Sequence, residues 1–198
     1  MTAPLDTDSD PKRARILEGA MKVFLTYGYQ RVTMEDIARA AEISRPALYL
    51  LFKNKADIYR AIGAALLERS AASAEEELAR EGSFVERMMA AVERALISMM
   101  RTIVDSPHGA EIVDHKNTLA ADLAAVWRGK LRETFRKAVL AEAKRNKVDL
   151  HARGLTAESL ADLLLDGLEG MKSRISDAGE QRKGAERLVR VIALALQG

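Results

Sequence analysis

Residues 28–55 read GYQRVTMEDIARAAEISRPALYLLFKNK, and this stretch decides the fold. Gly28 ends a preceding amphipathic segment, because glycine readily adopts a positive φ at a helix C-terminus. Thr33 offers an N-cap hydroxyl with an acid three residues later, which is close to a capping box. A short helix over 34–41 is followed by a tight connection and a third helix over about 45–52. Three short helices with a tight second connection predict a helix-turn-helix.

Small and apolar residues in this stretch have the spacing that locks two crossing helices together. Ala38 supplies the small residue at the crossing. The apolar residues that fit the packing are Ile37, Ala41, Ile43, Leu48, Leu51 and Phe52. The third helix has two possible starts: either Ser44 caps it through the Ala47 N–H, or Arg45 is the cap, since a residue before proline avoids the helical region. Pro46 is tolerated in both, because first-turn N–H groups have no helical partner.

Outside this stretch the chain also has the composition of a helical protein. It has 198 residues, of which 48% are hydrophobic and four are proline, with abundant Ala, Leu, Glu, Arg and Lys. We therefore expect an all-α fold. Residues 1–10 are rich in Asp and Thr and are expected to be disordered. Further helices are expected over 11–27, 56–80, 83–105, 108–121, 122–146, 157–175 and 182–197.

Composition excludes several classes of protein. The absence of cysteine excludes disulfides, thiolate chemistry and cysteine-bound metal, and it fits a reducing compartment. No apolar run approaches the roughly 18 residues of a membrane span. The acidic N-terminus does not resemble a signal peptide. We therefore expect a cytoplasmic protein, nucleoid-associated when it binds DNA, without a membrane partner.

Positive charge is concentrated in one block of the chain. Residues 1–11 carry a net charge of −3, whereas residues 12–55 contain nine Lys and Arg against four Asp and Glu, giving +5. Residues 56–198 contain 22 of each sign and are neutral. A basic block beside a neutral remainder favours a polyanion-binding module joined to a domain with another task. The alternative is a solvated helical surface.

The spacing of residues in this basic block has a known parallel. The positions in register are Gly28, Tyr29, Val32, Thr33, Ile37, Ala38, Ala41, Ile43, Ser44, Leu48, Tyr49, Phe52 and Lys55. This pattern closely resembles the N-terminal signature of the tetracycline-repressor (TetR) family of bacterial regulators. The resemblance implies an Ω-shaped all-α homodimer. Its helix-turn-helix domain, over 11–55, is expected to bind an operator, and its helical domain, over 56–198, is expected to dimerise and bind an inducer.

The resemblance also implies roles for individual residues. Thr33 and Tyr49 resemble residues of the family that contact phosphate, and Lys55 resembles the lysine that opens the fourth helix. The base-reading positions hold Arg45, Pro46 and Ala47. A bidentate Arg–guanine contact contributes about 1–3 kcal/mol of discrimination, whereas proline and alanine offer only apolar contact, for example to a thymine methyl. The basic Lys53 completes the expected DNA-binding set.

Each role has an ordinary structural alternative. Thr33 is either only a cap or also a phosphate contact, and Tyr49 is either a DNA contact or a core residue. Arg45 contacts either a base or a phosphate, and Lys53 is either a DNA contact or a solvated charge. The chain also departs from the family pattern, because Glu42 occupies a turn position that often holds glycine. Leu50 and Leu51 likewise replace residues that are often polar or aromatic, so we expect an apolar recognition surface at 46, 47 and 50.

Two later segments are expected to form the dimer interface. They are 157–175 and 185–196, and the second is apolar around much of its circumference, as in a four-helix bundle with a symmetric partner. The expected interface residues are Leu164, Gly167, Leu168, Met171, Leu188 and Ile192. The alternative is burial of these residues within one subunit.

The sequence offers weaker signals for a ligand site. Methionines at helical spacing and two aromatic residues can line an adaptable apolar pocket. The candidates are Met88, Met99, His115, Trp127 and Phe135, and ordinary core packing is the alternative. His108, Glu111 and His115 share a helical face with Asp122 one heptad later, an arrangement that suits a metal, a polar ligand or solvent. We expect no bound metal and no cofactor.

These patterns together favour one function. We expect a ligand-responsive regulator, most simply a repressor that a small, largely apolar inducer releases from a palindromic double-stranded DNA operator. The alternative is a helix-turn-helix nucleoid or adaptor protein without an inducer. An enzyme is not expected, because the chain lacks GxSxG, HExxH, a P-loop and a cysteine nucleophile.

Overall fold

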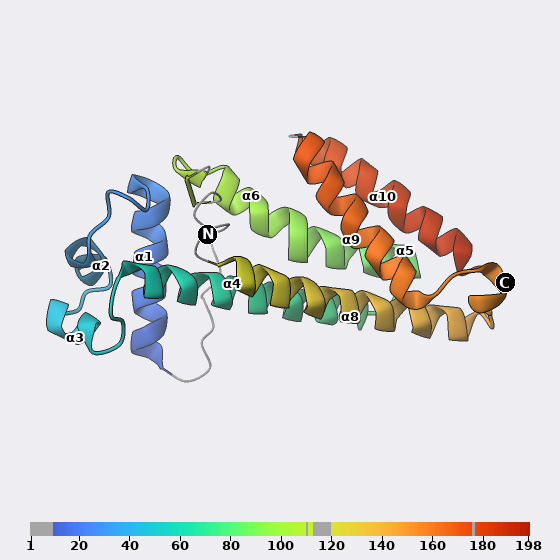
Figure 1. The fold of residues 1–198 in the computed structure, drawn as a ribbon, viewed down its shortest axis with the longest axis horizontal. Helices are drawn as coiled ribbons and strands as arrows, with labels where there is room; N and C mark the ends of the chain where they lie inside the picture. The colour runs from blue at the N-terminus through green and yellow to red at the C-terminus, as the bar shows by residue number, and fades with distance from the viewer. Residues whose placement is uncertain (1–9, 110, 113–119, 176) are drawn as a thin grey trace. The chain divides into compact units, whose positions relative to one another are not determined.

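The computed structural model describes residues 10–109, 111–112, 120–175 and 177–198 (Figure 1). Every regular element within these ranges is a helix, as expected. The described residues divide into two compact units, the first drawn from 10–69 and 99–125 and the second from 70–98 and 126–198. Among the described helices, none combines the length and the hydropathy needed to cross a bilayer.

The first unit begins with three helices whose ends are set by local capping. They are α1 (Pro11–Tyr27), α2 (Met34–Ala40) and α3 (Arg45–Tyr49). α1 begins where the Asp10 carboxylate accepts a hydrogen bond from the Lys12 N–H at 2.9 Å. It ends at Gly28, whose φ is 85°. The third helix is shorter than expected, because regular α-helix stops at Tyr49 and residues 50–51 continue as turns.

The core of this unit extends beyond the expected boundary at residue 55. Ile16, Leu17, Ile37 and Leu48 are buried together with Ile58, which lies in α4 (Lys55–Leu78). Residues 103 and 112 pack against the same core, the first from α6 (Met99–Val104). The helix-turn-helix is therefore stabilised by segments that follow it in the chain.

Gly19 brings two helices of the first unit into close contact. A Cβ built on Gly19 would lie 2.9 Å from the carbonyl carbon of Ala40 and 2.9 Å from the amide nitrogen of Ala41. These are backbone atoms, so a side chain at position 19 would force α1 away from the end of α2. The spacing of α1 and α2 thus depends on a glycine that the sequence pattern did not single out.

The second unit contains the remaining helices around a larger apolar core. They are the rest of α4, α5 (Phe84–Val92), the π-helix η1 (Glu93–Ser98), α8 (Ala121–Arg145) from Val126 onward, the 3-10 helix η2 (His151–Arg153), α9 (Ala157–Arg174) and α10 (Ala178–Ala195). The helix expected over 83–105 is thus interrupted by a π-helical segment. α10 begins earlier than expected, because Asp177 caps it and Gly179 lies inside its first turn.

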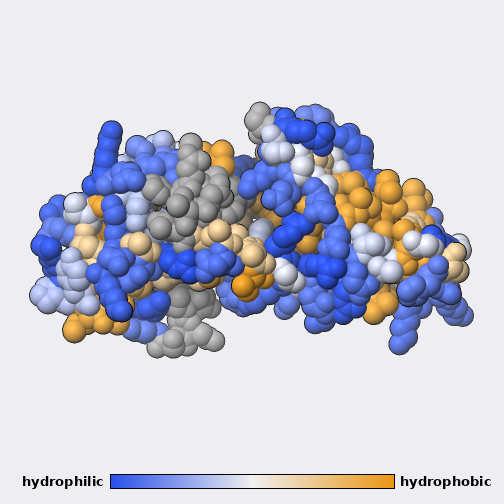
Figure 2. Space-filling model, in the orientation of Figure 1, coloured by the Kyte–Doolittle hydropathy of each residue, from blue (hydrophilic) through white to orange (hydrophobic). Residues whose placement is uncertain are grey.

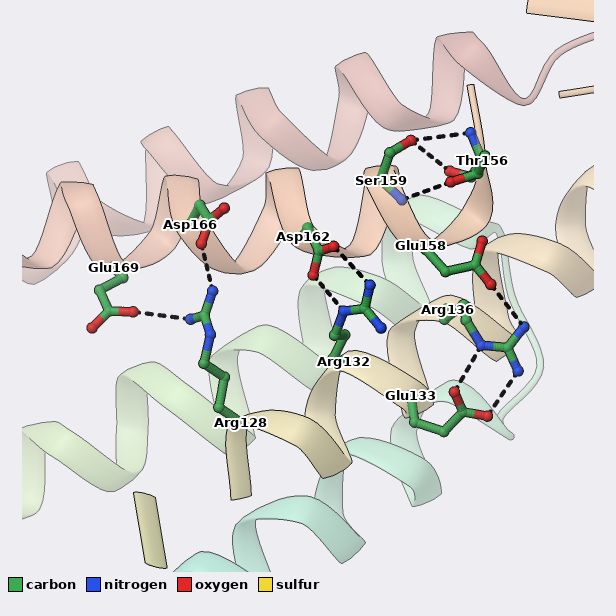
Figure 3. A network of polar contacts seen from close by, with 10 residues as sticks. All are labelled: Arg128, Arg132, Glu133, Arg136, Thr156, Glu158, Ser159, Asp162, Asp166 and Glu169. Carbon is green, nitrogen blue, oxygen red and sulfur yellow. Dashed lines mark hydrogen bonds and ion pairs between the residues drawn. The ribbon is translucent and has the colours of Figure 1, made fainter. Parts of the chain in front are cut away.

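A row of ion pairs connects α8 to α9 in the second unit (Figure 3). Arg128, Arg132 and Arg136 occur at four-residue intervals on α8 and therefore share one face. Their acidic partners on α9 are Glu158, Asp162, Asp166 and Glu169. The Arg132–Asp162 pair is bidentate, with N–O distances of 2.6 and 2.8 Å. This geometry fixes the register of the two helices along each other.

Candidate nucleic-acid interface

Thr33 forms the expected cap at the start of α2. Its Oγ1 accepts from the Asp36 N–H at 3.2 Å, and the Asp36 carboxylate accepts from the Thr33 N–H at 2.9 Å. The same carboxylate accepts from the Thr33 hydroxyl at 2.6 Å. These bonds lower the pKa of Asp36. The exposed hydroxyl therefore already has a partner for its proton.

Lys55 supports the loop that leads into α2. Its Nζ donates to three backbone carbonyl oxygens, those of Tyr29 at 2.7 Å, Gln30 at 3.2 Å and Val32 at 2.9 Å. It also lies 4.5 Å from the centroid of the Tyr29 ring. Burial lowers the pKa of this ammonium, and the nearby Glu111 carboxylate opposes the shift. All three protons are engaged inside the protein, so this geometry gives Lys55 a positioning role.

Glu111 holds the same loop from a segment far away in the sequence. Its Oε1 accepts from the Gln30 N–H at 2.7 Å, while its Oε2 lies 3.6 Å from Nδ1 of His108. Tyr59 adds a neighbouring contact, because its buried hydroxyl donates to the Ile112 carbonyl at 2.7 Å. Sequence spacing gave no signal for the Gln30–Glu111 and Tyr59–Ile112 contacts, which join residues more than fifty positions apart.

The turn between α2 and α3 is strained and held by α1. Glu42 has a φ of 54°, a conformation that side chains rarely adopt. Arg15 donates through Nη2 to the carbonyl oxygens of Ala41 at 2.9 Å and Glu42 at 3.3 Å. The Glu42 carboxylate lies 3.6 Å from the same guanidinium. Arg15 thus stabilises a turn in which glutamate stands where glycine is expected.

α3 presents an arginine and a tyrosine on one exposed strip. The Ser44 hydroxyl accepts from the Ala47 N–H at 3.3 Å, so Ser44 is the cap and Pro46 is the second helical residue. The Arg45 guanidinium lies over the Tyr49 ring, 5.6 Å from its centroid. Tyr49 is 43% exposed, which removes the core alternative for this residue.

A second strip of α3 is apolar. Pro46 is exposed, and Leu50 is 84% exposed. Ala47 is half-buried, and Leu51 packs against the core of the first unit, as its spacing predicted. Figure 2 shows hydrophobic surface in the region where Figure 1 places α3. The exposed Lys53 follows α3, so the surface combines basic, aromatic and apolar groups.

The expected ligand-site residues are placed mostly in the core of the second unit. Met88 and Phe135 are buried, and the partly buried Trp127 packs against the same core. Trp127 Nε1 donates to Ser70 Oγ at 3.0 Å, and that hydroxyl donates to the Ala95 carbonyl in the π-helical segment at 2.7 Å. Met99 falls in the first unit, at the start of α6. The expected His115 lies outside the described residues.

The structure buries most of the expected dimer residues within one subunit, which is the alternative that the sequence left open. Leu164 and Ile192 are each 1% exposed, and Met171 is also buried. Leu168 and Leu188 pack against the same core, and a Cβ on Gly167 would meet Leu188. The reason is that α9 and α10 pack on each other within one chain. The exposed apolar residues of these helices are instead Leu163, Val191 and Leu194.

The two acidic residues considered for a metal have other partners, and His115 lies outside the described residues. Glu111 accepts from Gln30, as described above, and Asp122 pairs with both terminal nitrogens of Arg60 at 2.9 and 2.7 Å. This ion pair lowers the pKa of Asp122 to about 2. Within the described ranges, no three His, Cys, Asp or Glu side chains form a group that could hold a metal ion.

The sequence of the helix-turn-helix matches a known family. The model described as "Bacterial regulatory proteins, tetR family" matches residues 16–62. The HTH-type transcriptional repressor ComR of Escherichia coli is 32% identical over 110 residues, which is 56% of this chain and 52% of ComR. The HTH-type transcriptional regulator AcrR of Shigella flexneri is 27% identical over 60% of this chain and 55% of AcrR. The chain thus aligns with about half the length of these relatives.

Solved structures share the fold over nearly the whole chain. The fatty acid degradation regulator FadR from Bacillus halodurans has a TM-score of 0.63 at 18% identity, covering 92% of this chain and 96% of FadR. The TetR family repressor AlkX from Dietzia has a TM-score of 0.60 at 20% identity, covering 96% of this chain and 97% of AlkX. At these identities the likeness concerns the fold.

Proposed function

We propose that this chain, whose residues 16–62 belong to the tetR family of bacterial regulatory proteins, is a DNA-binding transcriptional regulator. The observation that carries the proposal is the exposed face of α3 and of the residue after it, where Arg45 and Tyr49 lie beside Pro46 and Leu50, and Ser44 caps the helix. The names of the relatives favour a regulator over the alternative of a nucleoid or adaptor protein. We assign the chain no catalytic role, and a protein that binds operators works in the cytoplasm.

The proposed contacts divide into base reading and positioning. The N-terminal residues of α3 enter the major groove, where the Arg45 guanidinium can make a bidentate contact to guanine. Tyr49 and Lys53 contact phosphates, and Thr33 does so if its hydroxyl exchanges Asp36 for a phosphate oxygen. Lys55 acts indirectly, because it holds the loop before α2 through three carbonyls.

The apolar surface of the second unit supports the proposal of a dimer. Leu163 is 45%, Val191 56% and Leu194 62% exposed, and Figure 2 shows hydrophobic side chains gathered at the surface in the region of α9 and α10. We propose that a second copy covers this face, so that two α3 helices meet an inverted repeat about 34–36 Å, or a multiple, apart. Val191→Asp should convert the dimer to a folded monomer in sedimentation experiments. Val104→Asp, at an exposed site of the first unit, should leave the dimer intact.

The proposed inducer is a small, largely apolar molecule. Apolar side chains surround Met88, Phe135 and Trp127 in this core, and the Trp127 Nε1–H donates to the Ser70 hydroxyl. Two proteins of the same fold are described as a regulator of fatty acid degradation and as a repressor implicated in biodegradation of n-alkanes. An inducer that prefers one dimer geometry lowers operator affinity by that preference and no more. α4 is the proposed connection, because it contributes residues to both cores.

Selection of bound sequences from genomic fragments, followed by footprinting at two salt concentrations, tests the proposal. A protected inverted repeat with steep salt dependence is the expected result. Arg45→Ala should relax preference at one base pair in each half-site, whereas Tyr49→Phe should weaken binding similarly on all sequences. If both variants bind the selected operator as the parent does, the assignment of α3 is wrong. Diffuse protection without a symmetric site would favour the nucleoid alternative.

A further inference from the structure

Leu50 stands out as the most exposed large hydrophobic side chain in the described part of the chain, at 84%. Its exposure does not come from a disordered helix end, because its N–H still donates to the Pro46 carbonyl at 3.2 Å. Its neighbour Leu51 packs against the core, and Phe52 is buried. The chain thus packs the next two apolar residues against its core and leaves Leu50 in solvent.

The side chains around Leu50 indicate the kind of partner that this exposed residue contacts. Pro46 lies four residues earlier and so shares its face of the helix. The parallel strip holds the Arg45 guanidinium above Tyr49, and the exposed Lys53 follows. An apolar strip flanked by cations suits a polyanion that presents a small apolar group, because the cations contact its charges while the strip contacts that group.

The major groove of DNA presents one such group, the 5-methyl of thymine. We propose, on the basis of the function proposed above, that Leu50 together with Pro46 reads a thymine methyl in each operator half-site. Arg45 reads a guanine on the adjacent strip, so the operator contains a guanine and a thymine within the reach of one short helix. Leu50 is then a specificity-determining residue, and its contact is to the methyl rather than to a hydrogen-bonding edge of the base.

Replacing thymine by deoxyuridine tests this contact, because it removes only the methyl group. The full-length protein selects its operator from a random duplex library, and each thymine of the half-site is then replaced in both half-sites of the repeat. Binding is measured by fluorescence anisotropy at fixed salt. Burial of one methyl changes affinity about four-fold. At one position of the half-site, replacing thymine by deoxyuridine in both half-sites should therefore weaken binding about fifteen-fold.

The decisive comparison is between Leu50→Ala and the parent protein on the thymine and deoxyuridine operators. This variant should bind the thymine and deoxyuridine operators equally at the sensitive position, and its exposed site predicts unchanged folding by circular dichroism. Val104→Ala, which also truncates an exposed apolar residue of the first unit (57% exposed), should keep the discrimination. Arg45→Ala should also keep it while losing the guanine preference.

The outcomes separate the inference from the proposed function. If the protein binds an inverted repeat but no deoxyuridine substitution weakens binding, or if Leu50→Ala retains the discrimination, then the thymine contact is wrong and the regulator proposal stands. If Leu50→Ala binds every duplex as tightly as the parent, Leu50 does not contact DNA and the inference is wrong. If no sequence is selected, the proposed function and this inference both fail.

Discussion

Gly28 places the tightest local constraint on the loop that leads into α2, and its replacement by alanine tests the description of that loop. Its φ of 85° and ψ of 149° lie in a region that is essentially restricted to glycine. A side chain there strains the backbone by about 1–3 kcal/mol. The added Cβ would also overlap Oε2 of Glu111 and lie 3.0 Å from Nδ1 of His108.

The size of the effect follows from three contributions. Moving the Glu111 side chain breaks the hydrogen bond that its Oε1 accepts from the Gln30 N–H. The loss of this bond lowers the free energy of unfolding by about 1 kcal/mol. Alanine also restricts the unfolded chain, which offsets about 0.4–1 kcal/mol. With the backbone strain of Gly28→Ala included, we expect the free energy of unfolding to fall by about 2 kcal/mol.

Urea unfolding followed by circular dichroism at fixed protein concentration measures this loss. Gly63→Ala is the matched control, because Gly63 lies inside α4 in the same unit and a Cβ there meets nothing within 4 Å. Helix propensity predicts that this control gains up to about 1 kcal/mol. The two substitutions are chemically identical, so opposite signs isolate the local geometry.

A double-mutant cycle with Glu111→Ala separates strain from overlap. Once the carboxylate is removed, Gly28→Ala no longer displaces it, so the double variant should lose less stability than the two single variants combined. An unfolding free energy for Gly28→Ala equal to that of the parent would refute the description of this loop.

Three further predictions concern charged groups. Lys55→Met removes three hydrogen bonds to carbonyls and should lower the unfolding free energy by about 2–3 kcal/mol in urea titrations. It should also weaken DNA binding similarly on all sequences. Preserved stability would argue against the positioning role. The pKa of Asp122 is about 2 in the folded protein and 3.8 as the ordinary value, so its pairing with Arg60 stabilises the fold above about pH 4 and this contribution is lost as the pH falls toward 2. Asp122→Asn should remove that part of the acid dependence of the melting temperature, and an unchanged profile would contradict it. Arg132→Gln removes a pair that is about 40% exposed on both sides, so it should cause a small loss of stability that disappears in about 1 M salt; a loss that persists in salt would point to packing instead.

Local chemistry made much of the interface predictable from sequence. The capping box of α2, the Ser44 cap and the end of α1 at Gly28 depend on residues within a few positions of one another. Such signals are readable because the side chain and the backbone group that it satisfies are neighbours in the chain. The exposure of Leu50 was also predictable from nearby residues, because Leu50 shares a helical face with Pro46.

The supports behind the interface were not predictable in this way. Arg15 reaches a turn 26 residues away, Lys55 reaches carbonyls 23 to 26 residues away, and Glu111 reaches an amide 81 residues away. From the sequence, Lys55 was predicted to bind DNA and Glu111 to lie on a polar helical face. A sequence gives no information on which distant backbone groups lack a hydrogen-bond partner. Long-range satisfaction of backbone polar groups is decided by the fold.

The two C-terminal helices show why helical periodicity alone does not tell which face of a helix packs within its own chain. α10 carries apolar residues around much of its circumference, so helical periodicity gives two candidate stripes and no means of ranking them. Close packing within the chain decides, because Gly167 on α9 leaves space that Leu188 of α10 occupies, and this turns Ile192 inward. The second stripe, with Val191 and Leu194, stays exposed and is the face that we propose a second subunit covers. A helix that is apolar on two sides is thus an argument for two packing partners, of which the first is the helix's own chain.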